Sequence, residues 1–537
     1  MIERKKLRFA VLVDSAILKQ WQIDSIEDLL KSDKSECLCF IKNTSKASPS
    51  NSKTSIGFRL LYKSIDHNGP LSIVDWTKQF KSIPVLEFNP VQKGISSYLN
   101  EEDVTHFRAL NLDFVLRFGF GILKGEALTI PTYGIWSFHH GNPEYYRGGP
   151  AGLWEIIQKD RVTGSILQQL NKKLDQGNVL RRGFFQTIDH SYKANLHHIL
   201  DESSKWPSLV VTSILAHPEK LLVTSPISNK GKLYKIPSNW KTLQLFFRLF
   251  ENKIAFHLNR LFNAEKWNIG TVNQPIEDLV TNNLNKINWL NEAPKNQYFA
   301  DPFPWKSDQI LLELYNYKTE KGALKTLDRK SGKLIDFKNS ETHSSYPFTL
   351  EFAGKNYILP ENYRNKSLLL FEVKEDLTIE AKYELIKGEW IDPSLIQHNG
   401  HWWLFCTHQS SPKENLYVFY SENITGPYTA HLMNPVLTDI RSARPGGTPF
   451  VVNGKIIRPT QNCATTYGGS IVLKEIETLN TTEYSERFLK EIFPPKGRYS
   501  KGLHTLSKAG DKILVDGKRY HFNVSNFMHQ LKSSLKK

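Results

Sequence analysis

Cysteine is scarce in this sequence. The 537 residues contain four, at Cys37, Cys39, Cys406 and Cys463. So few cysteines in so long a chain do not build a disulfide framework, and no Cys-x-x-Cys pair indicates a thiolate metal site. We therefore expect no metal. Cys37 and Cys39 lie in a strand-like run, where residues i and i+2 share a face, and we expect both to be buried.

Long apolar runs are also missing. No stretch approaches the roughly 18 consecutive apolar residues of a membrane-spanning helix. The first residues, MIERKKLRFAVLVDS, combine a basic head with a short apolar run. This pattern predicts a first β-strand rather than a signal peptide. We therefore expect a cytoplasmic protein.

Acidic residues are outnumbered by basic ones. The chain has 54 Asp and Glu against 70 Lys and Arg, a formal net charge of +16. Such an excess favours anionic partners, for example nucleotide-activated sugars, a polyglutamylated cofactor or anionic lipid. The basic residues are scattered along the chain, so we expect no dedicated nucleic-acid binding. The length predicts two or three domains.

The first region, residues 1–215, alternates strand-like and helix-like segments. Its apolar runs, such as RFAVLV (8–13) and CLCFI (37–41), are typical of buried parallel strands. This alternation predicts an open, Rossmann-like α/β sheet. Ligands of such sheets bind beyond the carboxyl ends of the strands, which directs attention to the residues after LRFG (116–119) and IWSF (135–138).

The second region, residues 216–270, is predicted to be a helical linker. In NWKTLQLFFRLFENKIAFHLNRLF (239–262) the apolar residues recur at three- and four-residue steps, accompanied by lysine and arginine. Two interpretations remain open. The helix packs against a neighbouring domain, or residues 240–262 make peripheral contact with an anionic membrane surface.

The third region, residues 271–523, has an all-β pattern with an internal recurrence. Five segments combine a turn, a glycine and an apolar strand: ADPFPWKSDQILLEL, SYPFTLEFAGKNYILPEN, IDPSLIQHNGHWWLFCT, RPGGTPFVVNGKIIRPTQN and GLHTLSKAGDKILVDGKR. Five such units predict a five-bladed β-propeller. The remaining residues, 524–537, are predicted to be a flexible tail.

Acidic residues accompany these repeats. Asp301, Glu361 and Asp392 fall beside strand starts, and the starts of inner strands line the mouth of a propeller. We expect them to converge on a substrate pocket together with Arg444 and His504. Carboxylate pairs that flank a glycosidic bond are the working groups of most glycosidases. Asp-Pro corners also cap turns, so a structural role stays open for each.

The segment 134–180 holds the densest polar pattern of the first region. His139 follows a strand, and Asp175 lies 36 residues later, after a Gly/Pro/Arg loop and a helix-like segment. A helix and a strand between them can bring the two together. A carboxylate beside an imidazole favours its protonated form and fixes its orientation.

The whole segment resembles the formyltransferase family, which includes methionyl-tRNA, glycinamide ribonucleotide and sugar N-formyltransferases. The family shows Asn-x-His, a loop ending in Arg-Gly, then Thr-Gly, then Asp-x-Gly. The corresponding residues here are Ser137-Phe138-His139, Arg147-Gly148, Thr163-Gly164 and Asp175-Gln176-Gly177. The upstream LDFVLRFGFGIL (112–123) resembles the family's preceding strand and turn.

This resemblance implies transfer of a formyl group from 10-formyltetrahydrofolate to an amine. His139 would stabilise charge and move a proton, Asp175 would orient it, and Ser137 would stand where the family has its oxyanion-binding Asn. The folate would be bound by Phe118, Gly119, Gly121, Leu123 and Gly177. Arg147 either grips a phosphate or fastens its loop.

The third region resembles the propellers of the furanosidase superfamily of glycoside hydrolases. It is also similar to the propeller attached to plant glucosamine inositolphosphorylceramide transferases, in stretches such as FADPF, SYPF, DPSL, RPGG and GLHTLS. In those plant proteins the transferase is a separate domain, so no activity of the propeller itself is implied. The order of Asp301, Glu361 and Asp392 departs from the hydrolases' Asp, Asp, Glu.

Together these patterns predict an enzyme that formylates an amino sugar, nucleotide-linked, in surface-glycan biosynthesis. Arg147, Asp301, Glu361, Asp392, Arg444 and His504 are the expected substrate-binding residues. The alternative is a glycan-binding or glycan-processing propeller that carries a degenerate formyltransferase-fold domain. The acceptor sugar and the oligomeric state do not follow from the sequence.

Overall fold

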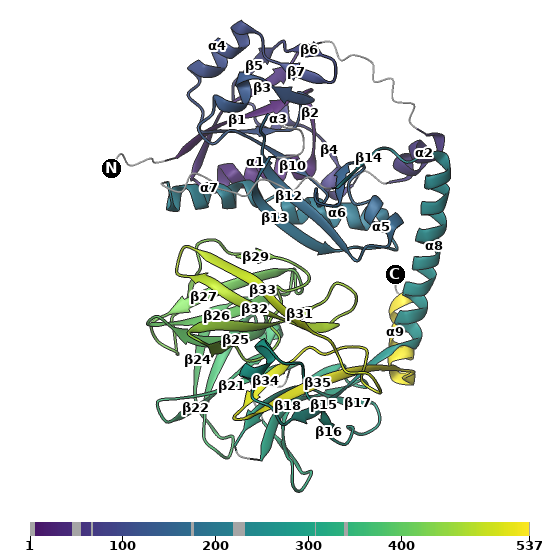
Figure 1. Cartoon of the computed structure of the whole chain (residues 1–537), viewed down its shortest axis with the longest axis vertical. Helices are drawn as coiled ribbons and strands as arrows, with labels where there is room; N and C mark the ends of the chain where they lie inside the picture. The colour runs from purple at the N-terminus through teal and green to yellow at the C-terminus, as the bar shows by residue number, and fades with distance from the viewer. Residues whose placement is uncertain are drawn as a thin grey trace. The chain divides into compact units, whose positions relative to one another are not determined.

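The chain divides into two compact units, Met1–Lys253 and Ile254–Lys537, in the computed structural model (Figure 1). The structure describes residues 6–45, 55–65, 68–172, 177–218, 231–306, 308–337 and 342–535. Asp175, a predicted catalytic residue, lies outside the described residues.

The first unit is built on a seven-stranded sheet in the order β13-β12-β10-β8-β1-β3-β5. β1 is parallel to β3 and β8, β8 is parallel to β10, and β12 and β13 continue the sheet antiparallel. The prediction of an open α/β sheet is confirmed. The strands are β1 (Leu7–Val13), β3 (Ser35–Asn43), β5 (Val85–Phe88), β8 (Phe114–Arg117), β10 (Ile135–His139), β12 (Val162–Gln169) and β13 (Asn178–Gln186).

Helices cover both faces of this sheet because β1 is apolar on both sides. Phe9 and Val11 belong to a core shared with the helices α1 (Gln20–Lys31), α6 (Tyr192–Ser203) and α7 (Trp206–Ala216). Ala10 and Leu12, one residue out of phase, belong to a second core with Phe107 of α4 (Glu101–Ala109). The alternation along one strand thus fixes the two layers of helices.

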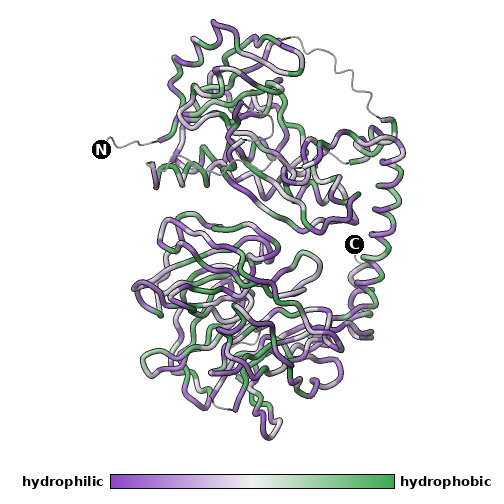
Figure 2. The backbone as a smooth tube through the Cα atoms, viewed as in Figure 1, coloured by the Kyte–Doolittle hydropathy of each residue, from purple (hydrophilic) through white to green (hydrophobic). Residues whose placement is uncertain are grey.

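The predicted helical linker, residues 216–270, is helical only in part. Two short strands, β11 (Tyr146–Gly148) and β14 (Lys232–Tyr234), pair in parallel, so residues 232–234 belong to the first unit. The helix itself, α8, spans Asn239–Phe262, and Figure 2 shows apolar and polar residues alternating along it. β15 (Ala264–Val272) is already a strand of the second unit. No helix among the described residues is long and apolar enough to cross a membrane.

The described residues of the second unit form five antiparallel sheets, in the number that the five sequence repeats predict. Four of them use strands consecutive in the chain: β17 to β20, β21 to β24, β25 to β28 (with β29 also on β27) and β30 to β33. The fifth, in the order β16-β15-β35-β34, joins the first strands of the unit to its last. Their arrangement as the blades of a propeller stays a prediction.

The bounds of these strands show how the repeats are used. In chain order they are β16 (Asn288–Trp289), β17 (Gln297–Trp305), β18 (Gln309–Asn316), β19 (Lys321–Asp328), β20 (Leu334–Asp336), β21 (Ser345–Phe352), β22 (Lys355–Glu361), β23 (Ser367–Val373), β24 (Ile379–Lys387), β25 (Trp390–His398), β26 (His401–His408), β27 (Asn415–Ser421), β28 (Thr429–Ala430), β29 (Leu437–Thr438), β30 (Phe450–Val452), β31 (Lys455–Asn462), β32 (Ser470–Leu479), β33 (Tyr484–Ile492), β34 (Leu506–Ala509) and β35 (Lys512–His521).

The segment predicted to be a flexible tail contains a helix, α9 (Val524–Leu535). Its Phe527 ring contacts Phe262 of α8 with the centroids 5.7 Å apart, and Arg260 donates a hydrogen bond to Gln530. Apolar residues at positions 524, 527, 528 and 531 give this segment one helical face. The sequence pattern was therefore sufficient for a helix, and the tail prediction overlooked it.

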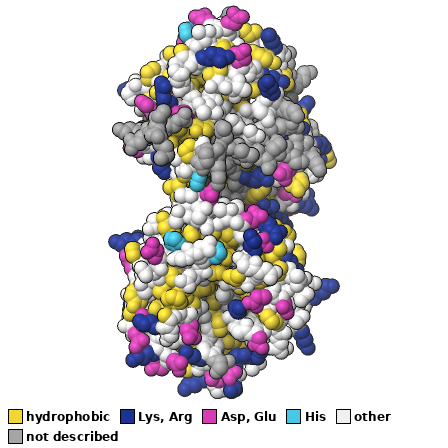
Figure 3. All heavy atoms as spheres, turned by 60° about the vertical axis from the view of Figure 1, so that its left-hand side comes forward, with side chains coloured by type: hydrophobic (Ala, Val, Ile, Leu, Met, Phe, Trp, Pro, Cys, Tyr) yellow, Lys and Arg dark blue, Asp and Glu magenta, His cyan; other side chains and the backbone are white. Residues whose placement is uncertain are grey.

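Lysine and arginine side chains do not form one continuous patch on the face shown in Figure 3. They lie scattered among acidic and apolar side chains.

Candidate functional sites

The carboxyl ends of β8 and β10 form the first candidate site. Trp136 of β10 pairs with Leu116 of β8 in parallel, so the residues that end these strands, Arg117 and His139, lie at the same edge of the sheet. Ligands of open α/β sheets bind at this edge. The structure therefore puts the two predicted segments, 116–123 and 135–139, side by side.

The loop after β8 is fastened by Asp14, the residue that follows β1. The backbone N–H of Phe120 donates to Asp14 Oδ1 at 2.7 Å. A Cβ atom at Gly119 would lie 2.6 Å from the backbone nitrogen of Asp14, so only glycine fits there. Phe120 and Gly121 have positive φ angles of 66° and 54°. The loop is thus held in one tight conformation.

Two cavities adjoin at this edge. The first, the His139 cavity, has a volume of about 200 Å³ and includes the predicted residues Gly121, Leu123, Ser137 and His139 in its lining. The second, the Trp21 cavity, has a volume of about 330 Å³ and includes the predicted Phe118 and Gly119. Four residues line both cavities: Arg117, Gly121, Ser137 and Phe138.

His139 is half-buried, and its Nε2 lies 3.0 Å from the carbonyl oxygen of Tyr146. A carbonyl can only accept, so this contact places the ring proton on Nε2. Nδ1 is then the nitrogen with a lone pair. The imidazole is suited to take up a proton at Nδ1 while Tyr146 holds the ring orientation.

Ser137 is buried, and its hydroxyl is in contact with a cation that the sequence analysis did not single out. Arg117 Nη1 donates to Ser137 Oγ at 2.9 Å, and Nη2 donates to the carbonyl of Gly121. Burial lowers the pKa of Arg117, and the nearby Asp14 carboxylate opposes that shift. The signal in the sequence was one arginine inside the otherwise apolar FVLRFG.

His140, the neighbour of His139, has a different environment. Burial, together with the neighbouring His139, lowers the pKa of His140 to about 3. Its Nδ1 lies 2.8 Å from Ser165 Oγ, and its ring stacks on Phe138 with the centroids 5.7 Å apart. His140 is therefore a neutral wall of the Trp21 cavity and not a proton donor near neutral pH.

The remaining residues predicted for this unit lie elsewhere. Gly177 directly follows the undescribed residues 173–176, and a Cβ there would lie 2.4 Å from the carbonyl oxygen of Gln169. Arg147 is in β11, where it pairs with Leu233 of β14. Neither residue is in the lining of the two cavities.

The second candidate site is a cluster of buried polar residues in the second unit. Three of its sheets share a β-bulge at a residue that is followed by proline. Asp301, Tyr346 and Asp392, each followed by proline, have φ angles of 49°, 44° and 47°. The strand register shifts at each of them, so each residue sits in a β-bulge. Positive φ in non-glycine residues is costly and concentrates at functional sites.

The predicted residues form two linked groups in this cluster. Asp392 Oδ2 accepts hydrogen bonds from Arg444 Nε and Gln461 Nε2, both at 2.6 Å, and its backbone N–H donates to Glu361 at 3.3 Å. All five predicted residues, Asp301, Glu361, Asp392, Arg444 and His504, are at most 9% exposed. The structure therefore buries every residue predicted for this site.

His504 joins two carboxylates. Its Nδ1 lies 2.6 Å from Asp516 and its Nε2 lies 3.3 Å from Asp301. Burial opposes the charged imidazole, but the two carboxylates prevail and the pKa of His504 is raised. The ring lies against Trp267 with centroids 4.0 Å apart and the ring planes tilted by 32°. Sequence reasoning missed Asp516, whose VDGKR context resembles an ordinary turn.

Two carboxyl groups of this cluster, those of Asp301 and Glu361, have raised pKa values. Burial raises the pKa of Asp301 to about 6, and burial with the neighbouring Asp392 raises the pKa of Glu361. Ligand atoms of Asp301, His504 and Asp516 lie within 4.8 Å of one another, so this trio can also hold a cation. Acidic groups with displaced pKa values beside Arg444 suit the recognition of sugar hydroxyls or glycosidic acid–base chemistry.

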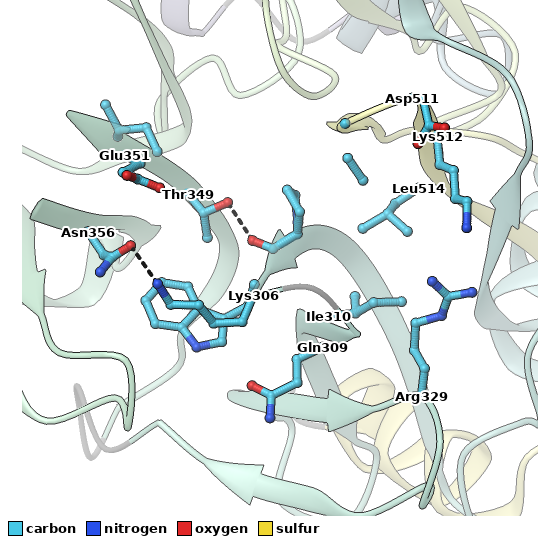
Figure 4. Close-up of a pocket in the computed structure, with 15 residues that line it drawn as sticks. Lys306, Gln309, Ile310, Arg329, Thr349, Glu351, Asn356, Asp511, Lys512 and Leu514 are labelled. Atoms are coloured by element: carbon cyan, nitrogen blue, oxygen red, sulfur yellow. Dashed lines mark hydrogen bonds between the residues drawn. The ribbon is translucent and has the colours of Figure 1, made fainter. Parts of the chain in front are cut away.

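A third cavity, of about 460 Å³, contains none of the predicted residues in its lining. It lies among the turns that join β17 to β18, β21 to β22 and β34 to β35 (Figure 4). Lys306 Nζ donates to Asn356 Oδ1 at 3.2 Å, and Thr349 Oγ1 donates to the carbonyl of Pro304 at 2.9 Å. Asp301 lies in the earlier part of β17, whose last residues line this cavity.

Comparison with known proteins finds two groups of relatives, each similar to part of the chain. Residues 247–502 match the family model "Glucosamine inositolphosphorylceramide transferase 1, N-terminal". The rice (Oryza sativa subsp. japonica) protein of that name is 33% identical over 208 residues, 36% of this chain and 28% of its own length. The chain is also 31% identical over 119 residues to methionyl-tRNA formyltransferase of Clostridium perfringens (strain SM101 / Type A), 22% of this chain and 38% of that protein.

A solved structure, glycinamide ribonucleotide transformylase 1 from Symbiobacterium toebii, aligns with a TM-score of 0.29 at 12% identity. The alignment covers 40% of this chain and 90% of that one. This chain spans well under half the length of each curated relative named above.

Proposed function

We propose that the first unit transfers a formyl group from 10-formyltetrahydrofolate to the amine of a sugar, with a nucleotide-linked amino sugar as acceptor. The observation that carries this proposal is the convergence of Ser137, His139 and the 118–123 loop on two adjoining cavities. The sequence similarity to a methionyl-tRNA formyltransferase supports the same chemistry.

The residues around the Trp21 cavity fit a flat heteroaromatic ring. Trp21 meets Phe118 and Phe138 edge-on, with centroids 5.5 Å and 5.1 Å apart, and Gly119 and Gly121 of the loop complete this side of the lining. The folate supplies the formyl carbon. The acceptor amine forms a bond to that carbon, the bond from the carbon to the folate nitrogen breaks, and the products are the N-formyl sugar and tetrahydrofolate.

In this proposal His139 moves the proton. The attacking amine becomes positively charged and must lose a proton, while the leaving folate nitrogen must gain one. We propose that Nδ1 of His139 takes this proton from the amine and passes it to the folate nitrogen, while the Tyr146 carbonyl holds the ring through Nε2. Asp175 remains the proposed partner of His139: its carboxylate can accept from Nδ1–H once Nδ1 has taken up the proton, and so hold the charged ring.

The test is turnover with purified protein, 10-formyltetrahydrofolate and a panel of amino-sugar nucleotides, with tetrahydrofolate release and formylated product measured together. We expect product with at least one acceptor and a loss of about 10²–10⁴-fold in His139→Asn. The control is His106→Ala, an exposed histidine on α4, which should leave the rate unchanged. No turnover across the panel and no folate binding would sink the proposal.

For the second unit we propose a five-bladed propeller whose acidic cluster binds a sugar. The name of the rice relative, a glucosamine inositolphosphorylceramide transferase, supports a sugar ligand. The alternative, a glycan-processing site, is favoured by the raised pKa of Glu361 beside Asp392. Calorimetric titration of the sugar panel against wild type and Arg444→Met tests the binding role. Formylation at unaltered kcat and KM in this variant would separate the second unit from the transfer reaction.

A further inference from the structure

Arg117 occupies an unusual position at the end of an apolar strand. Phe114, Val115 and Leu116 are fully buried, and the next residue directs a guanidinium group to the shared wall of the His139 and Trp21 cavities. Its contacts are the Ser137 hydroxyl and the Gly121 carbonyl. A cation is thus placed between the predicted folate loop and the predicted oxyanion position.

The guanidinium is not saturated by these contacts. It carries five N–H donors, and Nε is buried without a hydrogen-bond partner among the described residues. A buried donor without a partner costs free energy, so it calls for an explanation such as a catalytic role, a bound ion or a water. Asp14 lies close enough to favour the charged form. The group that fits is an oxygen atom carrying negative charge.

We propose that Arg117 stabilises the oxyanion formed during formyl transfer, with Ser137 as its positioning residue; this inference rests on the proposed function. When the amine adds to the formyl carbon, the electron pair of the C=O bond moves to oxygen. That oxygen accepts hydrogen bonds from the Arg117 guanidinium until the carbon–nitrogen bond to folate breaks and the carbonyl re-forms. The inference accounts for a serine where the resembled family has asparagine.

The first measurement is steady-state kinetics of Arg117→Ala, Arg117→Lys and the control Arg108→Ala, an exposed arginine on α4. We expect Arg117→Ala to lower kcat by about 10²–10³-fold with little change in the KM for 10-formyltetrahydrofolate. Arg117→Lys should retain part of the rate, and Arg108→Ala all of it. Added guanidinium at millimolar concentration should restore part of the Arg117→Ala rate without affecting the wild type.

The outcomes separate the two proposals. If the wild type binds folate and turns over but Arg117→Ala loses less than about threefold in kcat, the oxyanion inference is wrong. A rise in KM with unchanged kcat would assign Arg117 to fastening the loop instead. If the wild type itself shows no turnover, the proposed function has failed. Melting curves of each variant identify misfolding, and Arg117→Lys then serves as the informative variant.

A second inference concerns α8 and comes from an independent observation. One face of α8 packs on the first unit through Thr242 and Leu245, which are 1% and 0% exposed. A different face carries apolar residues at three- and four-residue steps that are 44–73% exposed: Trp240, Leu243, Phe247, Phe250, Ile254 and Leu258. The helix therefore has one face packed against the first unit and a second, apolar face exposed to solvent.

Basic residues lie on both sides of this uncovered stripe. At about 100° per residue, Lys241 falls on one side of the stripe and Lys253 on the other. Arg248 is paired with Glu251, and Arg260 is hydrogen-bonded to α9, so the charge available to a lipid surface is that of the two lysines. The only acidic residue in the helix is Glu251. Lysine and arginine reach from such flanks to phosphate groups while aromatic side chains enter the boundary between headgroups and acyl chains.

We infer that this stripe of α8 docks on an anionic lipid surface. Vesicle flotation tests it with phosphatidylcholine alone and with phosphatidylcholine containing phosphatidylserine. We expect the protein to float with the anionic vesicles at low salt, and less so at high salt because the charges are screened. Phe247→Glu/Phe250→Glu should not float. The matched control is Phe488→Glu/Phe493→Glu, a pair of comparably exposed phenylalanines in the second unit, which should float as the wild type does.

If the wild type does not float, or if both double variants lose flotation equally, the inference that the stripe docks on lipid is wrong. A second copy of the chain is the competing occupant of the stripe. Light scattering after gel filtration tests for it by measuring the oligomeric state. A dimer that Phe247→Glu/Phe250→Glu converts to monomer would also contradict docking on lipid.

Discussion

Glu155, in the short helix α5 (Trp154–Gln158), is a carboxyl group with no access to water. It is 1% exposed, and its Oε1 has no hydrogen-bond partner among the described residues. Burial raises its pKa from 4.5 to about 8. The folded protein therefore binds a proton here that the unfolded chain has released above pH 4.5. Stability must fall as the pH rises between about 4.5 and 8.

The prediction is that Glu155→Gln removes this dependence and stabilises the first unit at pH 8 by about 1–3 kcal/mol. Thermal denaturation at several pH values between 5 and 8 measures it. Glu36→Gln, at an exposed position of β3, should keep the wild-type pH dependence. Parallel curves for wild type and Glu155→Gln would contradict the assignment.

The four cysteines give a second prediction at this scale. Cys39, Cys406 and Cys463 are buried, as expected for Cys39, whereas Cys37 is only partly buried. Burial raises the pKa of all four thiols, to about 11 in Cys39. Since the thiolate is the reactive form, we expect slow labelling by a thiol reagent at pH 8 in the native protein and rapid labelling of four thiols after denaturation. Rapid labelling of the native protein would contradict this and show that local opening exposes the buried thiols to solvent.

At the scale of the element, the bulge in β25 gives a prediction about stability. Among the residues that the structure describes, Asp392 is the carboxylate that pairs with the buried Arg444, and Gln461 shares it. Asp392→Ala leaves a buried cation without its counter-ion, which should cost about 3–5 kcal/mol. The control is Asp376→Ala at an exposed position between β23 and β24. Urea unfolding of both variants measures the difference, and equal midpoints would contradict the pairing.

The elements that the sequence predicts well are those whose signal is local. The apolar run at 8–13 shows that β1 is covered on both faces, and the five repeats correspond to five sheets. Most of β15 falls within the predicted linker, residues 216–270, because its partner β35 is distant in the chain and the local sequence carries no signal of that pairing. Arg117 and Asp516 were missed for a similar reason. Only the folded sheet shows that these single charges face Ser137 and His504.

At the scale of the whole molecule, the pairing of β15 with β35 closes a sheet between the two ends of the second unit. The ladder runs from Ala264 opposite His521 to Val272 opposite Ile513. We predict that a fragment of residues 254–537 unfolds cooperatively in urea, as does 254–523, which lacks only α9. A fragment ending at 505, which lacks β34 and β35, should not show a cooperative transition. Circular dichroism of the three fragments measures this, and equal cooperativity would show that the closing sheet is dispensable.

The same pairing sets the order of events during synthesis. β15 leaves the ribosome long before β35, whose residues follow about 250 positions later. At roughly 5–20 residues per second, β15 waits on the order of ten to fifty seconds for its partner. Throughout that interval Trp267, Ile269 and their neighbours present an unpaired apolar edge, the kind of surface that joins other chains. Premature termination between β15 and β35 thus produces an aggregation-prone chain, and the yield in a cell depends on how well β15 is shielded until β35 has been synthesised.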